Sequence, residues 1–391
     1  MMNPICLHNG TVLTSFAAME QCAVFIENGV VSDVFSKKRF EKKLFPASTE
    51  ILDVEGAYIA PGFIDTHIHG TGGYGTDDAS TESALEMSRR LARTGVTAFN
   101  PTLYPTEPEM MIEAVRNVAA AMGRESGARI MGLHLEGPFL SPARLGVQRP
   151  ETLSPVDIAY MERLWEAAGG HIVNMTVAPE IKGMRELALY CIKKGIILQA
   201  GHTDAKYENM VEGMQAGILH STHLFNAMSK LDHRNPNAVG AVLIHPEMSC
   251  EIIADGRHVH PDLFKLLLRE KAIDKIVLVT DSLKPTGQQE GPLVANGEEV
   301  IFKDGLFYRK ADDVIAGSGL TMIRGVQNLT AFGFSLEDAV KTAGFNPAQV
   351  MRYRDKGALI PGKDADIVVF DRNFNILAVT VAGILKYNQF S

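Results

Sequence analysis

The sequence predicts an α/β protein, a (β/α)8 TIM-like barrel with a small β-sandwich domain built from both ends of the chain. Apolar strands alternate with amphipathic helices across residues 96–280, β-rich segments occur near both termini, and His, Asp or Glu follows several strands. A barrel gathers the carboxyl ends of its strands at one mouth, whereas an open sheet concentrates its site in one crevice. Polar residues after several different strands therefore favour the barrel.

The two ends of the chain share a short-strand texture. Residues 24–26 and 30–31 flank Asn28-Gly29, which predicts a hairpin, and Asn9-Gly10 is interpreted as a second turn. Apolar residues and turn signals return over residues 357–370. We expect residues 1–58 and 357–391 to form the β-sandwich domain and residues 59–356 to form the barrel.

The alternation in the middle of the chain gives the order of its elements. Strands are expected at residues 96–99, 130–135, 172–177, 196–200, 220–224, 249–254 and 276–280. Helices are expected at residues 109–122, 157–168, 184–194, 207–216 and 261–270. Residues 291–313 interrupt this pattern and predict an inserted hairpin that turns at Lys303-Asp304-Gly305, in a position to act as a lid over the barrel mouth.

Composition excludes several classes of protein. A net charge of -8 over 391 residues gives no support to a nucleic-acid-binding surface. The amino-terminal segment lacks the pattern of a signal peptide, and no apolar run is long enough to span a membrane. The cysteines form no C-x-x-C pair, which favours a reducing cytoplasm over a disulfide framework. They are Cys6, Cys22, Cys191 and Cys250.

Two histidines one residue apart open the candidate site. His67 and His69 would project from the same face of a strand. Two imidazoles at a strand end form a clamp for a divalent metal ion. The alternative is an ordinary pair of core or surface histidines, and the H-x-H pair alone does not decide between the two.

Four further residues follow later strands. Glu136 alone could be a helix cap or a solvated carboxylate, His202 and His223 could be core histidines, and Asp281 could be an N-cap. Their occurrence together, at the strand ends where barrel enzymes carry their active sites, favours a metal centre over five separate structural roles.

The same residues carry a family resemblance. The order H-x-H, H-L-E-G-P, G-H-T, H-L-F-N-A-M and V-T-D resembles the amidohydrolase superfamily. The strings His223-Leu224-Phe225-Asn226-Ala227-Met228, residues 253–259 and Ala316-Gly317-Ser318 are similar to those of the N-acetylglucosamine-6-phosphate deacetylases. The resemblance covers nearly the whole chain.

The resemblance implies a ligand set. His67, His69 and Asp281 would hold one divalent ion, His202 and His223 a second, and Glu136 would bridge them. Some family members lack the H-x-H pair and use only the Glu-His-His site, so the resemblance implies one or two ions per subunit. Mixed histidine and carboxylate ligands suit zinc or ferrous iron better than magnesium.

The resemblance also implies a sugar phosphate substrate and a homodimer. Asn226, Ala227, His233 and Arg234 would bind the phosphate, with the basic residue reaching across the dimer, and His258 would contact the sugar. Gln148 stands where the family usually has a histidine, and it can donate a hydrogen bond but carries no charge. We hypothesise that this enzyme relies more on its second metal or accepts a somewhat different acyl amino sugar.

By the same resemblance, a metal-activated water deacetylates N-acetylglucosamine 6-phosphate to glucosamine 6-phosphate and acetate in amino-sugar catabolism. Asp281 would act as general base and then as general acid. One alternative is the N-acetylgalactosamine 6-phosphate epimer. Another is a dihydroorotase-like or N-acyl-amino-acid hydrolase, although these usually show a bridging lysine in place of Glu136. A non-catalytic binding barrel is the third, and the complete ligand set argues against it.

Overall fold

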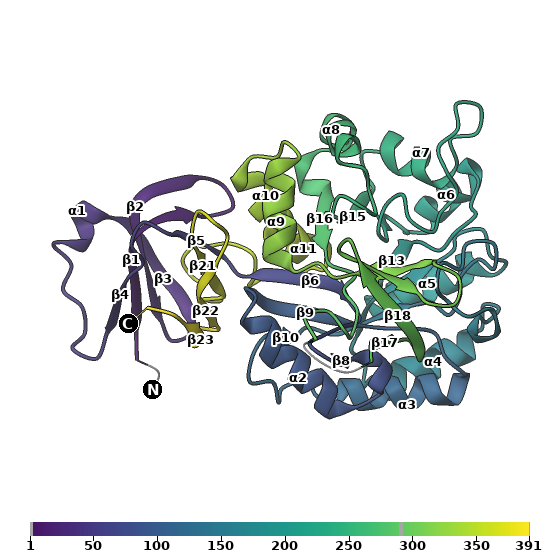
Figure 1. The fold of residues 1–391 in the computed structure, drawn as a ribbon, viewed down its shortest axis with the longest axis horizontal. Helices are drawn as coiled ribbons and strands as arrows, with labels where there is room; N and C mark the ends of the chain where they lie inside the picture. Colours follow the sequence, from purple (N-terminus) through teal and green to yellow (C-terminus); the bar gives the residue numbers. More distant parts are fainter. Residues whose placement is uncertain (1–2, 289–291, 391) are drawn as a thin grey trace.

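The computed structural model describes residues 3–288 and 292–390, which form a small β domain beside a larger barrel (Figure 1). Both ends of the chain lie in the β domain, so the barrel is inserted between its two halves. The expected fold class is confirmed. The expected boundaries at residues 58 and 357 stay a prediction.

Eight parallel strands form the barrel. Each pairs with the next in the order β6, β9, β11, β12, β13, β14, β15 and β16. The ring closes where the backbone N–H of Asp281, just after β16, donates to the carbonyl of His67 on β6 at 2.9 Å. The strands are β6 (Phe63–Ile68), β9 (Val96–Leu103), β11 (Leu133–Glu136), β12 (Ile172–Val177), β13 (Ile197–Ala200), β14 (His220–Ser221), β15 (Ser249–Ile253) and β16 (Ile276–Val279).

Amphipathic helices surround this ring. In α4, Tyr160, Met161 and Leu164 form the buried side, and the carboxylate of Asp157 caps the helix by accepting from the backbone N–H of Ala159. The expected helices all occur, within a few residues of their expected ends. The helices are α2 (Thr81–Ala92), α3 (Pro108–Ala119), α4 (Ile158–Ala167), α5 (Met184–Lys194), α6 (Tyr207–Gln215), α7 (Asn237–Ile244), α8 (Pro261–Glu270), α9 (Met322–Ala331), α10 (Leu336–Ala343) and α11 (Phe345–Val350).

The inside of the barrel is polar where the outside of its strands is apolar. His134 lies in this interior, with Nδ1 3.0 Å from the Thr102 hydroxyl and Nε2 2.9 Å from the Thr176 hydroxyl. Asn174 and Gln199 join the same hydrogen-bonded group. Because all five side chains are buried, their polar atoms must find partners within the barrel. A connected polar layer therefore lies beneath the mouth.

The β domain is a single hydrogen-bonded sheet in the order β23-β22-β21-β5-β1-β2-β3, with β4 also paired to β1. Antiparallel pairing of β5 with β21 joins the two ends of the chain, and both halves contribute side chains to one core. The strands are β1 (Ile5–Leu13), β2 (Ala18–Glu27), β3 (Val30–Ser36), β4 (Glu50–Asp53), β5 (Tyr58–Pro61), β21 (Ile367–Phe370), β22 (Ile376–Val381) and β23 (Ile384–Asn388).

The turn expected at Asn9-Gly10 is wrong. β1 runs straight through these residues, and its register against β2 shifts on either side of Gly10. Asn9 has a left-handed φ of 62°, which Asn tolerates better than most residues. A Cβ on Gly10 would lie 2.7 Å from Val54 Cγ2. The Asn-Gly pair thus marks an irregularity within a strand. Such an irregularity, like a hairpin turn, uses the left-handed backbone conformations that Asn and Gly tolerate.

The inserted segment after β16 is a four-stranded antiparallel sheet, with Lys303-Asp304-Gly305 at the turn between β18 and β19 as expected. Its expected start at Gly291 lies outside the described residues. The strands are β17 (Val294–Ala295), β18 (Glu298–Lys303), β19 (Leu306–Arg309) and β20 (Ile315–Ser318). A bridge between Ser282 and Ser318 ties β20 to the end of the barrel strand.

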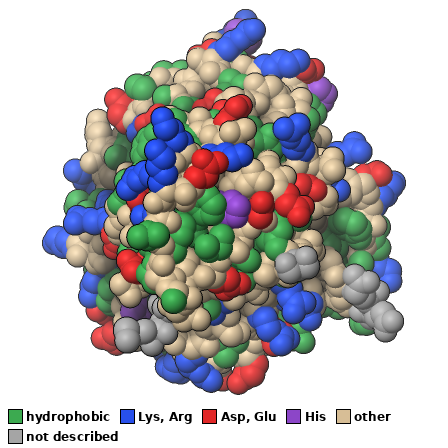
Figure 2. Space-filling view, turned by 90° about the vertical axis from the view of Figure 1, so that its left-hand side faces the viewer, with side chains coloured by type: hydrophobic (Ala, Val, Ile, Leu, Met, Phe, Trp, Pro, Cys, Tyr) green, Lys and Arg blue, Asp and Glu red, His purple; other side chains and the backbone are tan. Residues whose placement is uncertain are grey.

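The surface of the β-domain end carries mixed charge. Figure 2 shows Lys and Arg side chains interspersed with Asp and Glu there, and hydrophobic side chains in small groups among them. Positive and negative side chains are mixed on this face, in agreement with the modest net charge of the chain. Within residues 3–288 and 292–390, no helix is both long and apolar enough to cross a membrane.

Candidate active site

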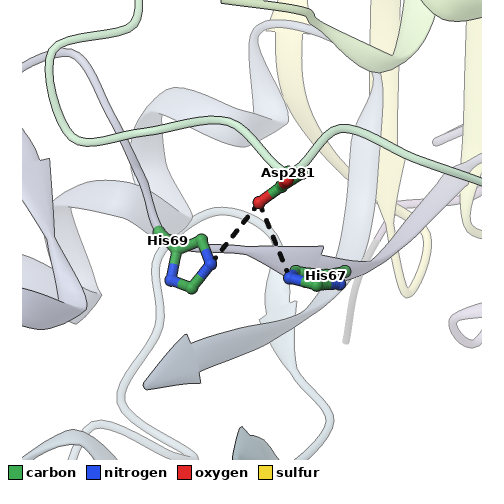
Figure 3. Close-up of side chains that lie close together, drawn as sticks. All are labelled: His67, His69 and Asp281. Carbon is green, nitrogen blue, oxygen red and sulfur yellow. Dashed lines mark ion pairs between the residues drawn. The ribbon is translucent and has the colours of Figure 1, made fainter. Parts of the chain in front are cut away.

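The first group of candidate ligands combines the end of β6 with the end of β16 (Figure 3). The Oδ1 atom of Asp281 lies 3.6 Å from His67 Nε2 and 3.4 Å from His69 Nε2. The ring of His69 is oriented by its other nitrogen, which lies 3.1 Å from the Thr102 carbonyl. With Nδ1 held by that carbonyl, Nε2 is the nitrogen that faces Asp281 and that would bind a metal ion.

The second group comes from the ends of β11, β13 and β14. Glu136 Oε1 lies 3.1 Å from His202 Nε2 and 3.2 Å from His223 Nε2. His202 Nδ1 lies 3.0 Å from the carbonyl of Arg144, which fixes the ring in the same way. Within each group, the candidate ligand atoms lie within 4.8 Å of one another, close enough to hold one metal ion.

Glu136 lies between the two groups. Its Oε1 is 3.5 Å from His67 Nε2 and its Oε2 is 3.4 Å from His69 Nε2, in addition to its contacts with the second group. Burial acts to raise the pKa of Glu136, but His202 and His223 outweigh burial and hold that pKa well below its usual value. An ionised carboxylate placed between two sets of imidazoles can bridge two cations.

Four observations fit a divalent metal at this place. The Nε2 atoms of His202 and His223 face each other at 3.2 Å, and His67 Nε2 is buried without a hydrogen-bond partner among the described residues. The donors are imidazole nitrogens and carboxylate oxygens, a set that zinc and iron accept. His202, His223 and Asp281 have φ values of 45°, 22° and 49°. Strained backbone of this kind gathers at functional sites.

A cavity of about 230 Å³ opens above these groups. His69, Glu136, His202, His223 and Asp281 line its floor, while His67 lies buried beneath. Of the residues expected to bind substrate, the cavity lining includes Gln148, Asn226, Ala227 and His258.

His233 and Arg234 are not brought to the cavity within one chain. They lie in the loop before α7, where the side chain of His233 is 78% exposed. Asp232 shapes this loop by accepting from the backbone N–H of Arg234 at 2.9 Å. The structure therefore leaves both basic side chains on the surface, free of the site that their own chain builds.

Gln148 contacts the bridging carboxylate directly. Its Nε2 donates to Glu136 Oε2 at 2.7 Å, and its Oε1 is buried without a hydrogen-bond partner among the described residues. The residue that departs from the family pattern thus touches the centre of the site. Its neutral amide supplies one donor there and leaves one acceptor unused.

His258 is held at the cavity wall by Asp255. The ring nitrogen Nδ1 lies 2.6 Å from Asp255 Oδ2, and the other carboxylate oxygen accepts from the backbone N–H of His258 at 2.8 Å. A ring fixed on its Nδ1 side can offer Nε2 to a ligand.

Sequence reasoning missed two parts of the site, Tyr104 and Glu251. Tyr104 stacks on His69 with ring centroids 3.8 Å apart. Residues 314–317, which follow directly on the segment expected to lie over the mouth, also line the cavity. Glu251 is fully buried on β15, with Oε2 2.9 Å from His67 Nδ1. Glu251 could have been found from the sequence, because it is a charged residue within the otherwise uncharged strand Ser249–Ile253, and charged residues are rarely buried without a partner. The stacking of Tyr104 had no such signal, since it depends on how β9 leaves the barrel.

The chain is similar to known proteins over almost its whole length. Residues 58–385 match the model of the Amidohydrolase family. The N-acetylglucosamine-6-phosphate deacetylase of Bacillus subtilis is 34% identical, covering 99% of this chain and 98% of that protein. The crystal structure of the Pasteurella multocida deacetylase of the same name superposes with a TM-score of 0.91 at 27% identity, covering 98% and 100% of the two chains. The structure of a mutant of the Mycobacterium smegmatis deacetylase in complex with N-acetyl-D-glucosamine-6-phosphate superposes with a TM-score of 0.90 at 28% identity, covering 99% of this chain and 100% of that chain.

Proposed function

The chain belongs to the amidohydrolase family, and we propose that it hydrolyses N-acetylglucosamine 6-phosphate to acetate and glucosamine 6-phosphate. The observation that carries the proposal is the position of Asp281, whose carboxylate lies beside His67 and His69 and lines the cavity. The resemblance expected from the motifs is confirmed by relatives named N-acetylglucosamine-6-phosphate deacetylase.

The chemistry follows from the residues around the cavity. A bound divalent ion, zinc or iron, would supply Lewis acidity, lowering the pKa of a water and polarising the acetyl carbonyl. Asp281 accepts a proton from the attacking water as the new carbon–oxygen bond forms. As the amide carbon–nitrogen bond breaks, Asp281 donates the proton to the leaving nitrogen. The His67, His69 and Asp281 group and the Glu136, His202 and His223 group would hold one ion each.

Substrate contacts come from the cavity wall. His258, fixed by Asp255, offers its Nε2 to a sugar hydroxyl, and Asn226 and Ala227 present backbone groups beyond His223. Gln148 can accept a hydrogen bond from the substrate at its unused Oε1. A buried acceptor without a partner costs stability, so a substrate donor that reaches it would gain affinity.

A phosphate is bound best by cations, and among residues 3–288 and 292–390 no Lys or Arg side chain lines the cavity. We assign this role to His233 and Arg234 of a second subunit in a homodimer. Their loop is exposed and begins soon after Ala227, which lines the cavity, so a partner's loop could approach the same region. Arginine pairs well with phosphate because its guanidinium can donate two parallel hydrogen bonds.

The setting we propose is amino-sugar catabolism in the cytoplasm. All four cysteines are free and buried, which supports a reducing compartment. The substrate is a small sugar phosphate, and neither a nucleic acid nor a membrane partner is part of the proposal.

A substrate panel tests the proposal. Chelator-treated protein, reloaded with zinc or ferrous ion, is assayed for acetate and free amine on N-acetylglucosamine 6-phosphate, its galactosamine epimer and unphosphorylated N-acetylglucosamine. We expect the phosphorylated gluco sugar to have the highest kcat/KM. A preference for the galacto epimer would reassign the substrate, and failure on both phosphorylated epimers would overturn the proposal.

A further inference from the structure

A carboxylate buried inside the barrel contacts the candidate metal centre from below. Glu251 on β15 has no solvent exposure. A buried charge is costly unless partners compensate it, so its contacts indicate what it serves. The mechanism proposed above makes no use of this residue.

The contacts of Glu251 lead to both candidate groups. Its Oε2 lies 2.9 Å from Nδ1 of the His67 ring and accepts from the backbone N–H of His223 at 3.3 Å. Its Oε1 accepts from Gln199 Nε2 at 3.1 Å. Glu251 therefore touches the imidazole of one group but only the backbone of the other.

The four candidate histidine ligands differ in what supports their second nitrogen. His69 Nδ1 faces the Thr102 carbonyl and His202 Nδ1 faces the Arg144 carbonyl, both neutral acceptors. His223 Nδ1 is buried with no hydrogen-bond partner in the described part of the chain. Of these four rings, His67 is the one whose Nδ1 faces a carboxylate.

We propose that Glu251 is a positioning residue that selectively strengthens metal binding at the His67, His69 and Asp281 group. By accepting the Nδ1–H of His67, it fixes the tautomer that points an Nε2 lone pair toward Asp281 and Glu136, 3.6 and 3.5 Å away. A carboxylate acceptor also makes the ring a stronger donor than a carbonyl acceptor does. The inference rests on the proposed function only in treating the two groups as metal sites.

Metal binding measured without substrate tests this inference. Chelator-treated wild type and Glu251→Gln are titrated with Zn²⁺ by calorimetry and with Co²⁺ by visible absorption. We expect two binding events in the wild type, and in Glu251→Gln a loss of about 10–100-fold in the affinity of one of them. The other should stay within about twofold, because the second group retains its ring contacts.

A double-mutant cycle identifies the affected ion. In a His69→Ala background, which removes a ligand of the first group, Glu251→Gln should no longer change the affinity of the ion that remains. A further loss there, equal weakening of both ions in the single variant, or no change in either would overturn the inference.

Asp65→Asn is the matched control. Asp65 is another fully buried acidic side chain, on the same strand as His67; its Oδ1 accepts from the backbone N–H groups of Thr280 at 3.3 Å and His67 at 3.4 Å, and it contacts no imidazole. If Asp65→Asn weakens the same ion as much as Glu251→Gln does, the effect does not depend on a contact between a carboxylate and an imidazole, and the inference fails. Should Glu251→Gln not fold, Glu251→Asp keeps the charge but withdraws it by one methylene, and the same selective weakening is expected.

The two proposals fail in different ways. If the protein does not deacetylate the substrate but Glu251→Gln still weakens the binding of one ion selectively, the substrate assignment is overturned and the role of Glu251 stands. If the protein deacetylates the substrate but Glu251→Gln changes the binding of neither ion, the substrate assignment stands and the role of Glu251 is overturned.

Discussion

The Nε2 atoms of His202 and His223 lie 3.2 Å apart, each also within 3.2 Å of Glu136 Oε1. The ring of His202 is held by the Arg144 carbonyl, which lies 3.0 Å from its Nδ1, so Nε2 is the nitrogen that faces His223 and Glu136. Two imidazoles and a carboxylate converging in this way form a ready set of ligands for a cation. Without one, the three groups depend on protons to offset their repulsion.

Metal removal should therefore destabilise the fold. Binding at a free ion concentration of about 100 times Kd stabilises the native state by about 2.7 kcal/mol per site. We expect chelation to lower the Tm and zinc or ferrous ion to restore it, as followed by calorimetry. Glu136→Ala is the control: it removes the shared ligand, so its Tm should respond much less to added metal. An equal response would remove Glu136 from the metal centre.

Asp281→Asn should abolish turnover while metal still binds. The variant keeps the shape of the side chain but cannot accept a proton, and positioned general bases contribute about 10²–10⁴-fold to the rate. We expect kcat for N-acetylglucosamine 6-phosphate to fall by that range, with at least one ion retained by metal analysis. Asp274→Asn, on an exposed residue away from the cavity, is the matched control. Unchanged turnover in Asp281→Asn would refute its role as base.

Gln148→Leu should lower kcat/KM. The substitution removes the 2.7 Å hydrogen bond to Glu136 Oε2 and leaves that carboxylate with one donor fewer. Hydrogen bonds to charged groups contribute about 1.5–3 kcal/mol, so we expect about a 10- to 100-fold loss in steady-state assays. Gln148→His restores a donor and should recover most of the activity. If Gln148→Leu matches the wild type, the amide has no part in the reaction.

Arg234→Ala should raise KM for the phosphorylated substrate far more than for N-acetylglucosamine. If the arginine acts across a dimer, subunits carrying Arg234→Ala mixed with subunits carrying Asp281→Asn should regain part of the lost activity. Such hybrids contain one cavity with an intact Asp281 and a partner's intact Arg234. No recovery after verified subunit exchange would place the phosphate contact elsewhere.

The parts of the site that could be predicted from sequence are side chains at strand ends. The H-x-H pair, Glu136 and Asp281 follow apolar runs that read clearly as strands, and a parallel barrel brings such ends together whatever the details of packing. Five of the helices between residues 96 and 280 were predictable because their apolar faces repeat with helical spacing. The exception is α7, which was not predicted: it is apolar and buried over six consecutive residues and so shows no such spacing.

What could not be predicted depends on backbone atoms and on three-dimensional packing. The Arg144 and Thr102 carbonyls that orient His202 and His69 carry no sequence signal, because every residue has a carbonyl. Glu251 stands out in the sequence as a charged residue within a buried strand. Its partner His67 could not be predicted, because it lies far away in the sequence. Asn9-Gly10 misled for a different reason, because a strand irregularity and a hairpin turn both require the left-handed conformations that this pair allows.

The most direct test of the central claim is hydrolysis in H₂¹⁸O. Metal-loaded protein is incubated with N-acetylglucosamine 6-phosphate, and both products are analysed by mass spectrometry. If a water activated beside Asp281 attacks the acetyl carbonyl, acetate should gain one ¹⁸O atom per turnover, and glucosamine 6-phosphate should appear in equal amount. Label-free acetate or no acetate at all would contradict the account.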